Sequence, residues 1–115
     1  MVDAYYRHGD PVMIDHTATS DIAAGQVVLI GNTTGLTCGI AHLAISNTYA
    51  GTLAAGGGVY DCVAASNYAA GTKVWWDDSA NKVTTTSTNN ALFGFTVEAA
   101  AAANAVIEVL HKPYV

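Results

Sequence analysis

Residues 70–86 read AGTKVWWDDSANKVTTT, which is a strand–turn–strand pattern. Two runs rich in β-branched and aromatic residues, 72–76 and 82–86, flank the polar segment 77–81. Asp side chains cap such segments locally and Asn tolerates positive φ, so the polar residues have a physical reason to turn the chain. The stretch predicts short β-strands joined by a turn.

The same pattern recurs along the rest of the chain. Further β-branched or aromatic runs occupy residues 11–14, 26–30, 39–45, 58–64, 91–97 and 105–111, with clusters of Gly, Asn and Asp between several of them. Residues 99–103 are five alanines, and five residues are too few to nucleate a helix alone. We therefore expect an all-β fold: a compact β-barrel or β-sandwich of short antiparallel strands, with at most one short Ala-rich helical turn.

The length of 115 residues favours one domain, in which folding buries about two thirds of the unfolded surface. Residues 1–10 are aromatic and mixed in charge, with no hydrophobic period of their own. We interpret them as an N-terminal arm and residues 11–115 as a single β domain. The arm lies outside the first expected β run, so we expect it to make contacts between subunits or with a partner.

Charge is scarce in this sequence. Charged residues make up 11% of the chain, and 9 acidic against 4 basic residues give a net charge of −5. Binding to nucleic acid or to an anionic membrane surface needs a cationic patch on the protein, so neither partner is expected. With 51% apolar residues, the chain is expected to cover part of its surface with sister subunits, as a homo-oligomer.

The residues that could carry chemistry do not form a catalytic or metal-binding pattern. The histidines (His8, His16, His42 and His111) show neither the i, i+4 spacing of a helical zinc site nor an HxH pair, and no serine lies in a GxSxG motif. Residues 56–58 are glycines, but no Lys-Ser or Lys-Thr follows them as in a phosphate-binding loop. We expect no enzyme activity, no cofactor and no metal. For Cys38 and Cys62, two buried free thiols are favoured over a disulfide.

Aromatic residues are the candidates for partner contacts. Trp75 and Trp76 are adjacent on an expected strand, so one ring should enter the core and the other should face outward, although core packing of both is the alternative. Interfaces are enriched in Tyr, Trp and Arg. The candidate interface residues are therefore Tyr5, Tyr6, Arg7, Trp75, Trp76 and Tyr114. Exposed Trp and Asn/Asp loops would also suit a carbohydrate- or ligand-binding β module, and a small metal-dependent hydrolase is a further alternative.

Several short motifs follow one another in a distinctive order. They are Gly-Asp-Pro-Val at 9–12, Ile-Ala-Ala-Gly-Gln-Val-Val-Leu-Ile-Gly at 22–31, Gly-Ile-Ala at 39–41, Gly-Val-Tyr at 58–60 and Ala-Gly-Thr-Lys-Val-Trp-Trp-Asp at 70–77. This order resembles the small capsid cement (decoration) proteins of tailed phages and prophages, over roughly residues 9–111.

The resemblance implies a β-rich structural subunit, usually trimeric, that binds the major capsid protein on the outer surface of the phage head and reinforces the shell. It also implies a place on the virion, after synthesis in the host cytoplasm. The two ends of the chain depart from the family pattern, and they would carry the contacts specific to this partner.

Overall fold

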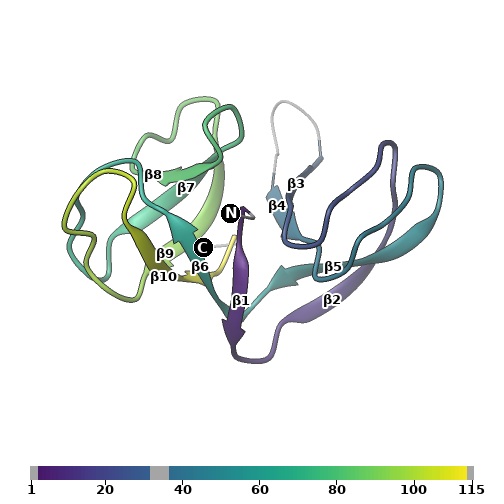
Figure 1. Cartoon of the computed structure of the whole chain (residues 1–115), viewed down its shortest axis with the longest axis horizontal. Coiled ribbons are helices and arrows are strands. Elements are labelled where there is room, and N and C mark those ends of the chain that lie inside the picture. The colour runs from purple at the N-terminus through teal and green to yellow at the C-terminus, as the bar shows by residue number, and fades with distance from the viewer. Residues whose placement is uncertain (1–2, 32–36, 114–115) are drawn as a thin grey trace.

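The computed structural model describes residues 3–31 and 37–113. These residues form two antiparallel sheets and no helix (Figure 1). The strands are β1 (Tyr5–His8), β2 (Val12–Thr17), β3 (Val27–Ile30), β4 (Thr37–Ile40), β5 (Ala50–Gly56), β6 (Val59–Val63), β7 (Lys73–Asp77), β8 (Lys82–Thr84), β9 (Ala91–Thr96) and β10 (Val106–His111). The all-β prediction is confirmed. The five alanines form a compact loop in which Ala100 makes a single bridge to Tyr68.

The sheets remain open and pack against each other as a sandwich. The six-stranded sheet has the order β1-β6-β10-β9-β7-β8, and the four-stranded sheet has the order β2-β5-β4-β3. Figure 1 shows the first sheet at the left and the second at the right, with β1 between them. The strands form two separate sheets with the main core between them and no closed barrel, so of the two expected forms the sandwich is the one observed.

Glycines let the chain cross twice between the sheets at one point. The first crossing joins β1 to β2 through Gly9 (φ 107°), and the second joins β5 to β6 through Gly57 (φ 86°) and Gly58 (φ 85°). A Cβ on Gly9 would lie 2.8 Å from the Cα of Gly58, which is closer than real Cβ contacts come. The two crossings therefore pass each other at backbone contact distance, which only glycine allows.

Two strands were missed by the sequence patterns. The expected arm contains β1, which pairs with β6, and its neighbour Ala4 is buried in the core. β1 is an edge strand held by backbone hydrogen bonds, and all four of its residues are exposed. Its sequence therefore has no hydrophobic period that would predict a strand. β5 was missed because its sequence, AGTLAAG, has few β-branched residues.

The turn expected at residues 77–81 is present between β7 and β8. The Asp77 carboxylate accepts hydrogen bonds from the Ser79 backbone N–H (3.1 Å) and from the Ser79 hydroxyl (2.7 Å). The Ser79 hydroxyl is the main cause that lowers the pKa of Asp77. Asn81 has a φ of 55° and donates its backbone N–H to the Asp77 carbonyl (2.8 Å). The expected turn chemistry is confirmed.

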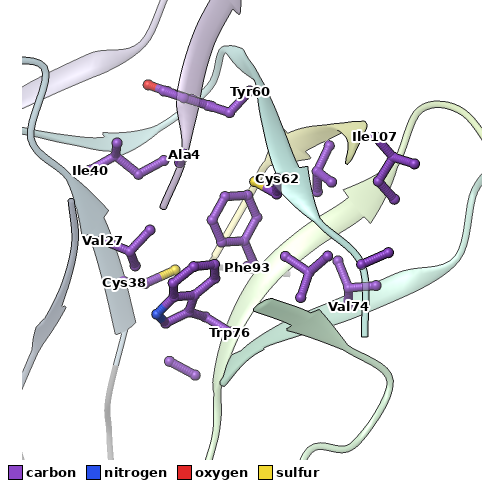
Figure 2. Close-up of a cluster of buried hydrophobic side chains, with 14 of the residues drawn as sticks. Ala4, Val27, Cys38, Ile40, Tyr60, Cys62, Val74, Trp76, Phe93 and Ile107 are labelled. Carbon is purple, nitrogen blue, oxygen red and sulfur yellow. The ribbon is translucent and has the colours of Figure 1, made fainter. Parts of the chain in front are cut away.

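The main core lies between the two sheets. Figure 2 shows Val27, Cys38 and Ile40 of the four-stranded sheet pointing toward Trp76, Phe93 and Cys62 of the six-stranded sheet. Trp76, Phe93 and Tyr60 are the largest of its fully buried side chains. Cys38 and Cys62 are both buried and free, as expected, and burial raises the pKa of the Cys38 thiol to about 12.

A histidine links the sheets inside this core. His111 on β10 is fully buried, and its Nε2 lies 2.9 Å from the carbonyl oxygen of Cys38 on β4. A carbonyl only accepts, so Nε2 carries the proton and donates it. His111 Nδ1 is buried without a partner among the described residues. Desolvation lowers the pKa of His111 to about 4, so the ring is neutral at pH 7.

A second, smaller core covers the far side of the four-stranded sheet. It consists of Ala18, Ile22, Ala41, Ile45 and Leu53, packed against Val28 and Ile30. The cover is formed by the segment after β2 and the segment after β4, which are joined by the reciprocal backbone bonds of Ile22 and Ile45 (2.8 and 2.9 Å). These connections therefore cover the far face of the sheet around Leu53, while the edge strand β2 stays exposed along most of its length.

Candidate interaction surface

The six-stranded sheet is covered on one face only. Along its strands, buried core residues alternate with residues that point away from the four-stranded sheet. We call this outer side the open face. Its members are Tyr5, Val59, Asp61, Lys73, Trp75, Leu92, Phe95, Glu108 and Leu110.

The centre of the open face is apolar. The strand register lines up Val59, Leu110 and Phe95 on β6, β10 and β9, and Phe95 is 38% exposed. Trp75 lies beside Leu92 on the neighbouring pair of strands. An uncovered group of large apolar side chains on one sheet face is a mark of a protein interaction site.

A hollow of about 380 Å³ interrupts the open face. It is lined by Gly71, Lys73, Leu92, Gly94, Phe95 and Lys112, and we call it the hollow. The depression exists because Gly71 and Gly94 present backbone without a side chain. Gly94 is required here, since a Cβ on it would collide with the carbonyl oxygen of Leu110.

Two lysines stand at the rim of the hollow. The Lys73 ammonium lies 5.5 Å from the centroid of the Trp75 ring, in cation–π contact. Lys112 follows β10 and donates its backbone N–H to the Phe93 carbonyl (2.7 Å). Neither lysine forms a salt bridge with a carboxylate of the described residues. The rim therefore offers two cations without local counter-charges.

At the β1 end of the open face, Arg7 and His8 lie beside carboxylates. Arg7 lies 3.7 Å from the Asp61 carboxylate, and His8 lies 3.3 Å from that of Glu108. Residues 8–72 contain no Lys or Arg, so every cation of the chain belongs to the six-stranded sheet or follows it directly. Of Asp, Glu, Lys and Arg, the strands and connections of the four-stranded sheet carry Asp only.

The most exposed large apolar side chains lie on the other sheet. Leu43 is 76% exposed and Tyr49 is 69% exposed, and both border one depression in the connection between β4 and β5. The Asp21 carboxylate accepts the backbone N–H of Asn47 (2.8 Å), which fixes a negative charge at this connection. We call Leu43, Tyr49 and Asp21 the knob. On the edge strand β2, Val12 is 64% exposed as well.

The structure places the interface residues predicted from the sequence in different environments. As expected from strand alternation, Trp75 is part of the open face while Trp76 is fully buried. Trp76 thus packs in the core of the subunit. Tyr5 lies on the open face, Arg7 pairs with Asp61 beside it, and Tyr6 stacks at the inner side on His42 and Tyr60. Tyr114 lies outside the described residues.

His42, which follows β4, is half-buried. Its Nε2 lies 2.6 Å from the Tyr60 hydroxyl, and burial lowers its pKa. Tyr6 packs against the same two rings, with centroid distances of 4.9 Å to His42 and 5.7 Å to Tyr60. This cluster fastens β1 to the core, so His42 has a packing role.

Sequence reasoning missed Phe95, Leu43 and Tyr49. Phe95 was hidden within an apolar run, and only the irregular pairing of β7 with β9 shows that it faces outward. No signal in the sequence indicated the exposure of Leu43, because it lies within the run 39–45 that was expected to form a strand. Tyr49 lies outside every expected run. In the structure β4 ends at Ile40 and the chain turns away.

The described residues contain neither a cluster of metal-binding side chains nor a membrane-spanning helix. Between residues 3–31 and 37–113, no group of three or more His, Cys, Asp or Glu side chains could hold a metal ion. The same part of the chain has no helix that is long and apolar enough to cross a membrane.

Comparison with known proteins gives one match. A family model described as phage cement protein matches residues 6–111, which include every strand except the first residue of β1. No curated protein and no solved structure matches the chain.

Proposed function

The chain belongs to the phage cement protein family, and from this premise we propose that it acts as a homo-oligomer, in the form of a trimer, bound to the major capsid protein on the outside of the head. Its role is structural: it decorates a phage capsid. Neither the carbohydrate-binding module nor the metal-dependent hydrolase gains support from the family match.

The observation that carries the proposal is the open face. A sheet face that carries Phe95 exposed and Trp75, Leu92 and Leu110 half-buried, without a covering layer, favours contact with a protein partner, because the contact removes apolar area from water. The knob adds a second uncovered apolar site on the other sheet. A subunit with two such sites can contact more than one neighbouring subunit at the same time.

A structural role without catalysis fits the chemistry of the described residues. The buried thiols have raised pKa values, so they are poor nucleophiles, and the buried His111 is locked to a carbonyl. The sandwich interior is filled by large side chains. We propose that the chain has no enzymatic activity, and that it is made in the host cytoplasm before it joins the virion.

The proposal is tested with heads of the phage that encodes this chain, produced without the chain. Purified protein is first analysed by sedimentation equilibrium, and we expect the mass of a trimer. It is then added to the heads, which are pelleted and analysed for bound protein. Saturable binding to heads supports the proposal, and binding to isolated major capsid protein assemblies identifies the partner. Absence of binding to heads would overturn it.

A further inference from the structure

We propose that the knob of one subunit seats in the hollow of the next subunit, so that copies of this chain join head to tail into a closed ring. This inference rests on the proposed homo-oligomer and names the surfaces that form it. The occupant of the hollow is thus a second copy of the chain.

The hollow suits an apolar side chain that is accompanied by a carboxylate. Leu92 and Phe95 supply apolar walls and the glycine backbones supply the floor, while Lys73 and Lys112 stand at the rim. These lysines have no salt bridge with a carboxylate of the described residues. A partner that fills the hollow with an uncharged ring or branched chain and brings an acid to the rim satisfies both features.

The knob has this composition. Leu43 and Tyr49 are the most exposed large apolar side chains of the described residues, and the Asp21 carboxylate is held at the same connection by its bond to Asn47. The charge complementarity extends beyond the contact, since residues 8–72 have no Lys or Arg whereas all cations lie on or beside the six-stranded sheet.

The knob is also rigid before it binds. Its connection is tied to the segment after β2 by the Ile22–Ile45 pair of backbone bonds and by the bonds of Ala18 with Thr48 and Tyr49 (2.9 and 3.0 Å). A preformed knob loses little conformational entropy when it seats, which favours its use as an anchor.

Topology makes the contact intermolecular. The hollow opens on the side of the six-stranded sheet that points away from the four-stranded sheet, and the knob belongs to the four-stranded sheet. A knob therefore cannot reach the hollow of its own chain. Two different surfaces that meet form a heterologous interface, and such an interface closes into a ring when the rotation allows it. A three-membered ring agrees with the proposed trimer.

The test uses one variant for each surface and a matched control for each. The hollow variant carries Lys73→Glu and Lys112→Glu, and its control is Lys82→Glu, a lysine of β8 that does not line the hollow. The knob variant carries Leu43→Asp, and its control is Val12→Asp, an exposed apolar residue of β2. All five substitutions are at residues outside the core, so the circular dichroism of the four variants should remain that of the wild type.

Sedimentation equilibrium gives the first result. We expect the hollow and knob variants to associate about 30-fold more weakly or worse, as for loss of an interface anchor, and the two controls to match the wild type. Wild-type association in either surface variant would overturn the inference. Dissociation of Val12→Asp would also overturn it, because the β2 edge would then be the interface.

Mixing the two surface variants gives the second result. The knob variant keeps an intact hollow and the hollow variant keeps an intact knob, so a head-to-tail contact joins them into a one-to-one dimer that cannot grow. An interface made of the same patch on both subunits gives no such dimer, and that outcome would overturn the inference. Native mass spectrometry distinguishes the two.

Head binding separates this inference from the proposed function. If the wild type is an oligomer that binds heads and the hollow variant stays oligomeric but no longer binds, the hollow holds the capsid protein, and only the inference fails. If the wild type does not bind heads under any condition, the proposed function fails. Full head binding by a dissociated knob variant supports both, since the ring and shell contacts are then distinct.

Discussion

The two sheets of this protein bury their apolar residues in different ways. The six-stranded sheet concentrates large side chains, Trp76, Phe93 and Tyr60, on one face and leaves its other face uncovered. The four-stranded sheet uses small residues toward the main core and covers its far face with its own connections around Leu53. The first sheet therefore needs a partner to complete its burial, while the second sheet supplies exposed apolar side chains at a connection. In the head-to-tail contact that we propose, the incomplete sheet of one subunit receives the exposed connection of the next.

The backbone of the open face provides the strongest test of this comparison. Gly94→Ala places a Cβ against the Leu110 carbonyl oxygen inside the six-stranded sheet, and we expect a loss of about 4 kcal/mol in the free energy of unfolding. Gly71→Ala is the control: its φ is 83° but no atom lies near the new Cβ, so about 1 kcal/mol is expected. Urea unfolding measures both. Equal losses at the two positions would contradict the close packing of β9 on β10.

The two cores should contribute differently to the free energy of unfolding. Trp76→Ala removes the largest fully buried side chain of the main core, with an expected loss of about 4 kcal/mol. Leu53→Ala in the second core should cost about 3 kcal/mol. Thermal or urea unfolding followed by far-ultraviolet circular dichroism gives the values. A larger loss for Leu53→Ala would mean that the four-stranded sheet, and not the six-stranded one, dominates stability.

Acid should lower the free energy of unfolding through His111, which links the two sheets. The folded pKa of His111 is lowered from 6.5 to about 4, so the unfolded state binds the proton first. The stabilisation is complete above pH 6.5 and is lost as pH falls from 6.5 to 4, by about 3 kcal/mol.

Unfolding by urea across this range measures the effect, with His111→Gln as the control. Gln keeps a donor for the Cys38 carbonyl but does not titrate, so its stability should change much less with pH. A smaller slope of the same sign remains from His42, whose pKa burial also lowers. Identical slopes in both proteins would show that His111 does not carry the acid sensitivity.

The smallest effect is expected at the paired charges of the open face. The Arg7–Asp61 pair spans 3.7 Å and the arginine side chain is 49% exposed, so Arg7→Ala should change the free energy of unfolding by no more than about 0.5 kcal/mol. Chemical denaturation in low and high salt checks this. A loss several times larger would make β1 a main element of the six-stranded sheet and not an edge.

Local chemistry made part of the fold predictable. Most strands carry β-branched residues, which favour strands, and the turn at residues 77–81 carries Asp and Asn, which favour turns. The opposite directions of Trp75 and Trp76 followed from the alternation of side chains along a strand. β1 and β5 lacked that signal, since one is an exposed edge and the other is rich in Ala and Gly.

The interaction surface was predictable only in part. Trp75 and Tyr5 lie on the open face, and both were candidates because exposed aromatic residues in a charge-poor chain suggest contacts. The hollow could not be found, because Gly71, Gly94 and Lys112 come from separate parts of the chain and meet only through the register of β7, β9 and β10. The knob depends on where β4 ends, which tertiary packing decides.

Heat-induced release of DNA tests most directly whether this chain reinforces a phage head. Heads assembled without the chain are compared with the same heads after the purified protein is added, with a nucleic-acid dye as the reporter. The account predicts that heads carrying the protein retain their DNA to a higher temperature, and that the knob and hollow variants restore less of this protection than the Lys82→Glu control. Release at the same temperature with and without bound protein would contradict it.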